Sequence, residues 1–136
     1  MSANAGRVAA DTNVALYVAS SDEEKVGRAK ALLALEPITS VQVLNEVTNV
    51  CLRKFKFSWG QVDRFIETTT ALCYVVPVTI NVYDETCRLA RRYKFSIWDA
   101  GIVASALVAG CDTLYTEDMQ HGLVVDDRLT LINPFL

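Results

Sequence analysis

Short apolar runs alternate along the chain with segments in which apolar residues recur at helical spacing. The runs predict strands at 7–10, 38–39, 73–78, 113–116 and 129–132. Between them, residues such as Ala29, Leu32 and Leu33 are spaced as on one face of a helix. Strands separated by helices imply right-handed crossovers. The pattern therefore predicts an α/β fold with a mainly parallel central sheet and helices on both faces.

Capping residues predict where the helices begin. Ser58 and Gln61 have the spacing of a capping box that starts a helix at Trp59. Ser96 and Asp99 have the same spacing, with Asp in place of Glu, and open an apolar helix that ends near residue 110. Further helices are predicted from residues 12, 21, 40 and 79. The run 73–78 is β-branched without alternation, which predicts a strand buried on both faces.

The 136 residues are enough for one domain with a real core. We expect residues 1–6 to be an N-terminal tail and 7–136 to be the domain. Apolar residues make up 51% of the chain, which is high for a small monomer and suggests that a partner or a second copy covers some surface. No uncharged stretch reaches the roughly 20 residues that span a bilayer. A cytoplasmic protein without a membrane segment is expected.

Cysteine usage and net charge narrow the classes of function. Cys51, Cys73, Cys87 and Cys111 include no Cys-x-x-Cys pair, and there is one histidine, so a zinc site is not expected. Each cysteine has apolar neighbours, which predicts a place in the core. The net charge of −3 argues against broad electrostatic binding to nucleic acid, although it permits a local basic face.

Four acidic residues occupy positions that point to a metal site. Asp11 and Asp118 follow predicted strands, and Glu46 and Asp99 lie on or beside the apolar faces of helices. Individually they could be a cap, part of a capping box or a turn residue. Gathered at the carboxyl edge of a parallel sheet, four carboxylates would repel one another unless a hard cation such as Mg²⁺ or Mn²⁺ joined them.

The segments around these acids resemble the four motifs of PIN-domain nucleases, in order and over nearly the whole chain. They are VAADTN at 8–13, SVQVLNEV at 40–47, SIWDA at 96–100 and LYTEDMQHG at 114–122. The length is typical of the VapC toxins of toxin–antitoxin pairs. The resemblance implies a PIN-like three-layer fold, Mg²⁺- or Mn²⁺-dependent endoribonuclease activity on RNA, a homodimer and an antitoxin partner.

The same resemblance implies roles for individual residues. Asp11, Glu46, Asp99 and Asp118 are carried over as the catalytic, metal-binding quartet, and Glu117 is a neighbour that can share the role of Asp118. Thr12, Asn13, Thr116 and Glu117 are then expected to orient the acids through hydrogen bonds. His121 follows a turn, and a structural role is favoured over that of a general base. Candidate RNA-binding residues are Arg53, Lys54, Lys56, Arg91, Arg92 and Lys94, with solvated helix faces as the alternative.

Two alternative functions would need motifs that the sequence lacks, and a third needs no motif. An aspartyl-phosphate phosphohydrolase usually needs Asp-x-Asp, and here position 13 is Asn. A metal adhesion site would need serines after Asp11, and these are absent. The third alternative, a catalytically silent protein that only binds a partner, is not excluded by the sequence. For an antitoxin, the segment 12–35 offers Leu16, Tyr17, Leu32 and Leu33 as groove residues, with burial inside the monomer as the alternative.

Overall fold

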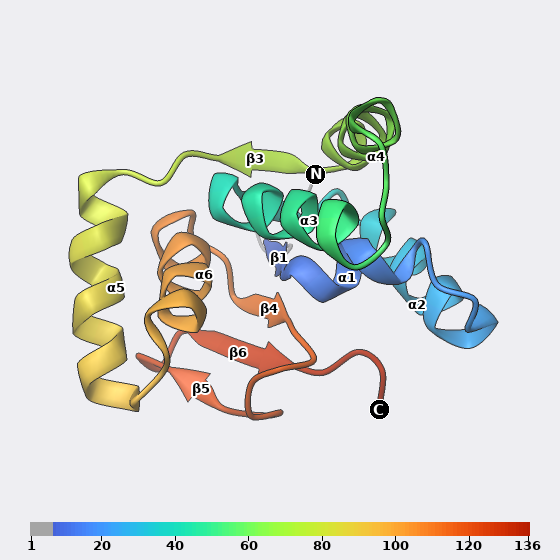
Figure 1. Ribbon diagram of the computed structural model, residues 1–136. Coiled ribbons are helices and arrows are strands. Elements are labelled where there is room, and N and C mark those ends of the chain that lie inside the picture. The colour runs from blue at the N-terminus through green and yellow to red at the C-terminus, as the bar shows by residue number, and fades with distance from the viewer. Residues whose placement is uncertain (1–6) are drawn as a thin grey trace.

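The computed structural model describes residues 7–136 and contains six helices and six strands within that range (Figure 1). In chain order the elements are β1 (Val8–Ala10), α1 (Thr12–Tyr17), α2 (Glu23–Leu33), β2 (Ile38–Ser40), α3 (Val41–Arg53), α4 (Trp59–Leu72), β3 (Tyr74–Val76), α5 (Ile80–Tyr93), α6 (Ile97–Val108), β4 (Thr113–Tyr115), β5 (Val124–Val125) and β6 (Leu129–Ile132). The expected tail, 1–6, lies outside the described residues. None of the described helices combines the length and apolarity needed to cross a membrane.

One sheet carries all six strands, in the order β3-β2-β1-β4-β6-β5. Every pairing is parallel except that of β5 with β6. The predicted α/β fold with a mainly parallel sheet is confirmed. Strand β1 lies between β2 and β4, with Ala9 in register with Ile38 on one side and Leu114 on the other. The strand order reverses there, so the carboxyl ends of β1 and β4 form the switch point at which α/β proteins place their sites.

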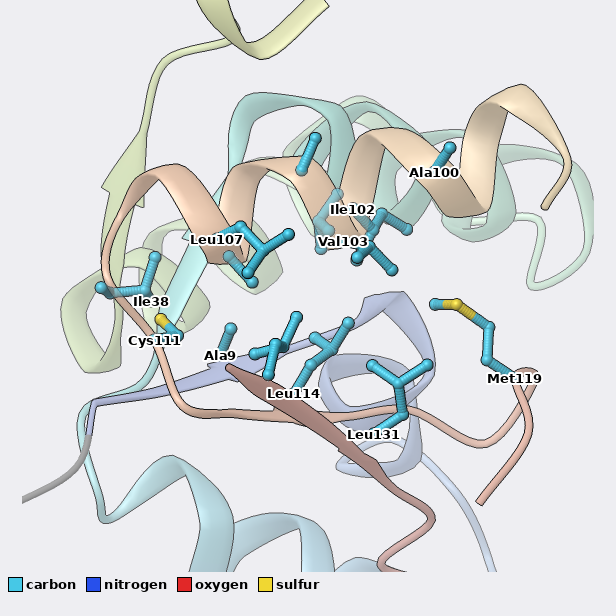
Figure 2. Packing of buried hydrophobic residues seen from close by; sticks show 14 of the residues in the cluster. Ala9, Ile38, Ala100, Ile102, Val103, Leu107, Cys111, Leu114, Met119 and Leu131 are labelled. Atoms are coloured by element: carbon cyan, nitrogen blue, oxygen red, sulfur yellow. The ribbon is translucent and has the colours of Figure 1, made fainter. Parts of the chain in front are cut away.

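Helices cover both faces of the sheet. On one face α6 packs over the strands, and Figure 2 shows Val103 and Leu107 pointing toward Leu114 and Leu131. On the other face Val14, Ala29 and other residues of α1 and α2 bury Ala10 in a second cluster. Residues 100–107 of α6 are all buried because α5 packs along the helix on the side away from the sheet. Full burial of a leucine side chain such as Leu114 contributes about 1.5–3 kcal/mol.

The capping predictions are confirmed at four helices. Ser58 and Gln61 form both bonds of the capping box, at 3.2 and 2.8 Å. The hydroxyls of Ser40, Thr79 and Ser96 each accept from the backbone N–H three residues later. Helix α2 begins at Glu23, two residues after the predicted start at residue 21, because the short carboxylate of Asp22 caps it by accepting from two N–H groups at once.

The prediction of a strand buried on both faces at 73–78 is wrong. Strand β3 is an edge strand that pairs only with β2, and its Tyr74 is 68% exposed. An unbroken apolar run indicates that the segment favours an extended backbone. It does not distinguish a central strand from an edge strand with an apolar surface. The two-residue strand β5 was not predicted, since Val124 and Val125 are too few for a pattern.

The cysteine predictions hold only in part. Cys51 and Cys111 are buried, as expected, whereas Cys73 and Cys87 are half-buried. Cys73 precedes the exposed edge strand and Cys87 lies on α5, whose outer side faces solvent. All four are free thiols. Leu32 and Leu33 are 9% and 5% exposed, so the alternative of burial inside the monomer holds for both.

Candidate functional site: four carboxylates at the switch point

Asp11 lies directly after β1 and caps the first helix. Its backbone N–H continues the ladder to β4 by donating to the Tyr115 carbonyl at 3.0 Å. Its carboxylate accepts two hydrogen bonds, from the Thr12 N–H at 2.6 Å and from the Thr116 hydroxyl at 2.8 Å. The side chain is only 3% exposed. Asp11 is therefore fixed in a dry position at the switch point.

Burial and like charges raise the pKa of Asp11 from 3.8 to about 6. Removal from water is the largest cause, and the negative charges of Glu46 and Asp118 add to it. The hydrogen bonds from Thr116 and Thr12 act in the opposite direction. The structure thus brings the charges of three predicted site residues within electrostatic reach of one another.

Glu46 lies on α3, one turn after Gln42. One of its oxygens accepts from the Thr12 hydroxyl at 3.3 Å, and the other accepts from the Gln42 side-chain amide at 2.9 Å. Thr12 therefore connects the two acids, because its N–H bonds Asp11 while its hydroxyl bonds Glu46. Glu46 is half-buried at the edge of the apolar face formed by Val43 and Val47.

Asn13 holds the segment that follows β4. Its amide N–H donates to Asp118 at 3.0 Å, and its amide oxygen accepts from the Glu117 N–H at 3.4 Å. The Asp118 N–H donates in turn to the Thr116 hydroxyl at 3.3 Å. The carboxyl ends of β1 and β4 are thereby tied together by side chains from α1.

Glu117 has partners of its own. The Tyr17 hydroxyl donates to Glu117 at 2.7 Å, and the Lys25 ammonium lies 3.7 Å from its other oxygen. Lys25 also donates to the Tyr17 hydroxyl and lies 4.6 Å from the centre of its ring. Glu117 is thus paired with a cation, whereas Asp118 is bonded to the neutral amide of Asn13.

Asp99 occupies the first turn of α6, where its N–H donates to Ser96. Burial raises the pKa of its half-buried carboxyl, the charge of Asp118 raises it further, and a hydrogen bond with Ser96 lowers it. Figure 2 shows Ala100 and Met119, the neighbours of these two acids, at the same end of the packed core. Asp99 therefore faces the carboxyl edge of the sheet, near Asp118.

The quartet consists of carboxylate oxygens, which are ligands of hard divalent cations. Within residues 7–136, no three His, Cys, Asp or Glu side chains stand close enough to hold a metal ion as they are placed. None of the ion pairs in that range involves Asp11, Glu46, Asp99 or Asp118. The raised pKa values of Asp11 and Asp99, to which neighbouring negative charges contribute, fit a bound divalent ion, which would compensate that charge.

The candidate RNA-binding residues differ in their surroundings. Arg53 donates to Asn49 on its own helix, and Lys54 and Lys56 are exposed. Arg91 and Lys94 are exposed at the end of α5, whereas Arg92 lies 4.0 Å from Asp126. The neighbouring Arg88 pairs with both Asp126 and Glu85 and lowers the pKa of Asp126. Part of the basic cluster on α5 therefore fastens that helix to the turn between β5 and β6.

The sequence analysis did not predict that Gln42, Tyr17 and Lys25 contact the acidic site. Gln42 stands four residues before Glu46, a spacing that allows side-chain hydrogen bonds along a helix and was an available signal. Tyr17 and Lys25 are eight residues apart on different helices, and no local pattern relates them. His121, by contrast, has a structural contact, since its Nδ1 accepts from the Asn133 N–H at 2.9 Å.

A groove of about 520 Å³ opens beside the acidic site. It is lined by α1, the segment after it and the end of α3, through Asn13, Leu16, Tyr17, Ala19, Ser20, Ser21, Val50, Lys54 and Phe55. Asn13 belongs both to this groove and to the hydrogen bonds of Asp118. The groove therefore adjoins the acidic site at Asn13.

The fold and site define an α/β protein with uncompensated carboxylates at the switch point of a parallel sheet. Residues 8–123 match the PIN domain, and the chain belongs to that family. No curated protein sequence matches the chain.

Several solved structures have the same fold. A toxin–antitoxin complex from Klebsiella pneumoniae superposes with a TM-score of 0.70 at 19% identity, covering 94% of this chain and 97% of that one. FitAcB from Neisseria gonorrhoeae superposes with a TM-score of 0.67 at 19% identity, covering 94% of this chain and 98% of that one. VapC20 from Mycobacterium tuberculosis is a toxin that cleaves the sarcin–ricin loop. It superposes with a TM-score of 0.63 at 22% identity, covering 82% of this chain and 89% of that one. At these identities the likeness establishes the fold.

Proposed function

We propose that this PIN-domain protein is a metal-dependent endoribonuclease. The observation that carries the proposal is Asp11, a buried carboxylate whose pKa is raised by burial and by Glu46 and Asp118, and which has no ion-pair partner among residues 7–136. Buried charged groups in proteins are usually paired or bound to a metal, and a divalent cation would compensate the charge of Asp11. Membership of the PIN family supports the interpretation as a nuclease.

Asp11, Glu46, Asp99 and Asp118 are the residues that would hold Mg²⁺ or Mn²⁺. When bound, the ion would supply an activated water and stabilise negative charge on the phosphate. Thr116 and the Thr12 N–H fix the Asp11 carboxylate. Asn13 sets the direction of Asp118, while Tyr17 and Lys25 hold Glu117 apart from it. These contacts orient the acids before substrate arrives, which is the purpose of such supporting groups.

RNA would reach the site along local positive charge. The exposed Lys54 and Lys56 follow α3, which also carries Glu46, and Arg91 and Lys94 stand shortly before Asp99 in the chain. We propose these residues, with Arg53 and the partly paired Arg92, as phosphate contacts. Asp11 is a poor candidate for a phosphorylated nucleophile, since both of its oxygens accept hydrogen bonds and it is 3% exposed.

The direct test is incubation of the purified protein with a panel of structured RNAs, a sarcin–ricin-loop RNA among them. Cleavage is expected with Mg²⁺ or Mn²⁺ and not with excess EDTA. Full activity in EDTA would place the chemistry elsewhere.

We further propose that the protein is the toxin of a toxin–antitoxin pair, in the cytoplasm, and that the antitoxin occupies the groove beside Asn13. The groove combines apolar Leu16 and Phe55 with polar Ser20 and Lys54, which suits an amphipathic segment. An Arg side chain of that segment could reach the unpaired carboxylates, because its planar fork bridges oxygens. Such a contact would exclude metal and RNA together.

Ala19→Trp is expected to abolish neutralisation by the antitoxin while leaving RNA cleavage unchanged. Ala19 is exposed and lines the groove, so the new side chain fills it without disturbing the core and without adding a cation beside the carboxylates. Ala31→Trp, on the exposed side of α2, is the matched control. Growth is measured during co-expression with the small open reading frame next to the gene. Rescue of the Ala19→Trp variant by the antitoxin would place the partner on another surface.

A homodimer is proposed from apolar side chains left in solvent on one stretch of chain. Tyr74, Val78, Ile80 and Tyr83 are 49–77% exposed, and they run from β3 into the first turns of α5. Light scattering over a range of concentrations is expected to give twice the mass of the chain, and Ile80→Lys is expected to shift it toward the monomer. A wild-type protein that stays monomeric at high micromolar concentration would contradict the dimer.

A further inference from the structure

Gln42 connects Glu46 to the start of α6. Its side-chain nitrogen donates to the second oxygen of Glu46 at 2.9 Å and to the backbone carbonyl of Trp98 at 2.8 Å. Both partners are acceptors, so the NH₂ group and not the amide oxygen must face them. Both amide protons of Gln42 are used, and the Glu46 carboxylate gains a neutral donor on the side away from Thr12.

Gly101 leaves the space in which this amide lies. A Cβ atom built at position 101 would stand 2.3 Å from the side-chain oxygen of Gln42 and 3.3 Å from its amide carbon. The close atoms are the far end of a flexible side chain, so a methyl group there would displace the amide rather than the helix backbone. A glycine inside a helix lowers stability relative to alanine, because it loses more backbone freedom on folding. In the buried helix α6, Gly101 leaves room for the side-chain amide of Gln42.

We propose that Gln42 is a positioning residue that holds the Glu46 carboxylate beside Asp11, and that Gly101 provides the room it needs. Glu46 and Asp11 repel, and the Thr12 hydroxyl alone, at 3.3 Å, is a long bond for keeping Glu46 in place. The Gln42 amide also fixes Glu46 relative to the first turn of α6, which carries Asp99. This inference rests on the proposed metal site and names two further residues on which its geometry depends.

The test measures Mn²⁺ affinity by electron paramagnetic resonance of the free ion, which needs no turnover. Gln42→Ala is expected to weaken Mn²⁺ binding by about 10-fold, the lower end of what loss of such a supporting hydrogen bond produces. Gly101→Ala is expected to weaken it similarly, because the methyl group displaces the amide. The double variant is expected to bind like Gln42→Ala alone, since the methyl then occupies vacated space.

Gly27→Ala is the matched control for the glycine change. Gly27 is on the exposed side of α2, and a Cβ atom added there would meet only open space, so this variant gains helix propensity and should keep full Mn²⁺ affinity. Thermal melts check that each variant is folded. If Gln42→Ala does not fold, Gly101→Ala tests the same contact with the glutamine present.

The possible results distinguish failure of the positioning role of Gln42 from failure of the proposed metal site. Wild-type protein that binds no Mn²⁺ would overturn the proposed metal site and the inference with it. Wild-type binding with unchanged affinity in folded Gln42→Ala would overturn the positioning role and leave the nuclease proposal intact. Losses that add up in the double variant would show that Gly101 does not act through Gln42.

Discussion

Asp11→Asn and Asp99→Asn are each expected to lower metal-dependent RNA cleavage by at least about 100-fold, since a metal ligand should matter no less than the groups that support it. The amide has nearly the shape of the carboxylate but carries no negative charge. At position 11 its oxygen still accepts from the Thr12 N–H, and its NH₂ can donate to the Thr116 hydroxyl. The loss should therefore come from weaker attraction of the cation.

Asp63→Asn is the control for both substitutions, because Asp63 is an exposed acid on α4. It removes one negative charge and should leave cleavage unchanged. Rates under single-turnover conditions, together with circular dichroism of each variant, separate a chemical defect from a folding one. Undiminished cleavage by either site variant would remove that carboxylate from the reaction.

Local signals in the sequence were sufficient for most of the fold. Helix starts were predictable because a hydroxyl that satisfies a free N–H acts within three residues, as Ser58 does with Gln61. The sheet was predictable because helices between strands leave few topologies. Asp11 directly follows β1 and Asp118 comes three residues after β4, so the two acids had to meet at one edge once those strands were parallel neighbours.

Contacts between distant elements were not predictable from local patterns. The exposure of β3 depends on which strand ends up at the edge, and its apolar residues carry no mark of that position. Glu117 and Asp118 are adjacent and chemically alike, and only the packing of α1 and α2 gives Glu117 the partners Tyr17 and Lys25. The role of Gly101 likewise depends on a glutamine 59 positions away on another helix.

Without metal, Asp11→Asn is expected to be more stable than the wild type at neutral pH and about equally stable near pH 4. The folded-state pKa of Asp11 is about 6, above the value of 3.8 expected when the chain unfolds. Below pH 3.8 the carboxyl is protonated in both states, so its ionisation does not affect stability there. Between pH 3.8 and 6 the unfolded chain ionises first, which stabilises the unfolded state and lowers the free energy of unfolding.

The size of this effect follows from the same two values. Their difference corresponds to ~3 kcal/mol, and the full loss is present above pH 6. The Asn variant lacks the titration and should escape that loss, apart from changes in its hydrogen bonds to Thr12 and Thr116. Urea unfolding of both proteins in EDTA from pH 4 to pH 8 measures the difference in their free energies of unfolding, which should grow between pH 4 and 6 and then stay constant.

Saturating Mn²⁺ should stabilise only the wild type, because binding to the folded state alone raises its free energy of unfolding. A difference that does not vary with pH would mean that Asp11 is not a strained carboxylate, and the main physical argument for a cation at this site would fall.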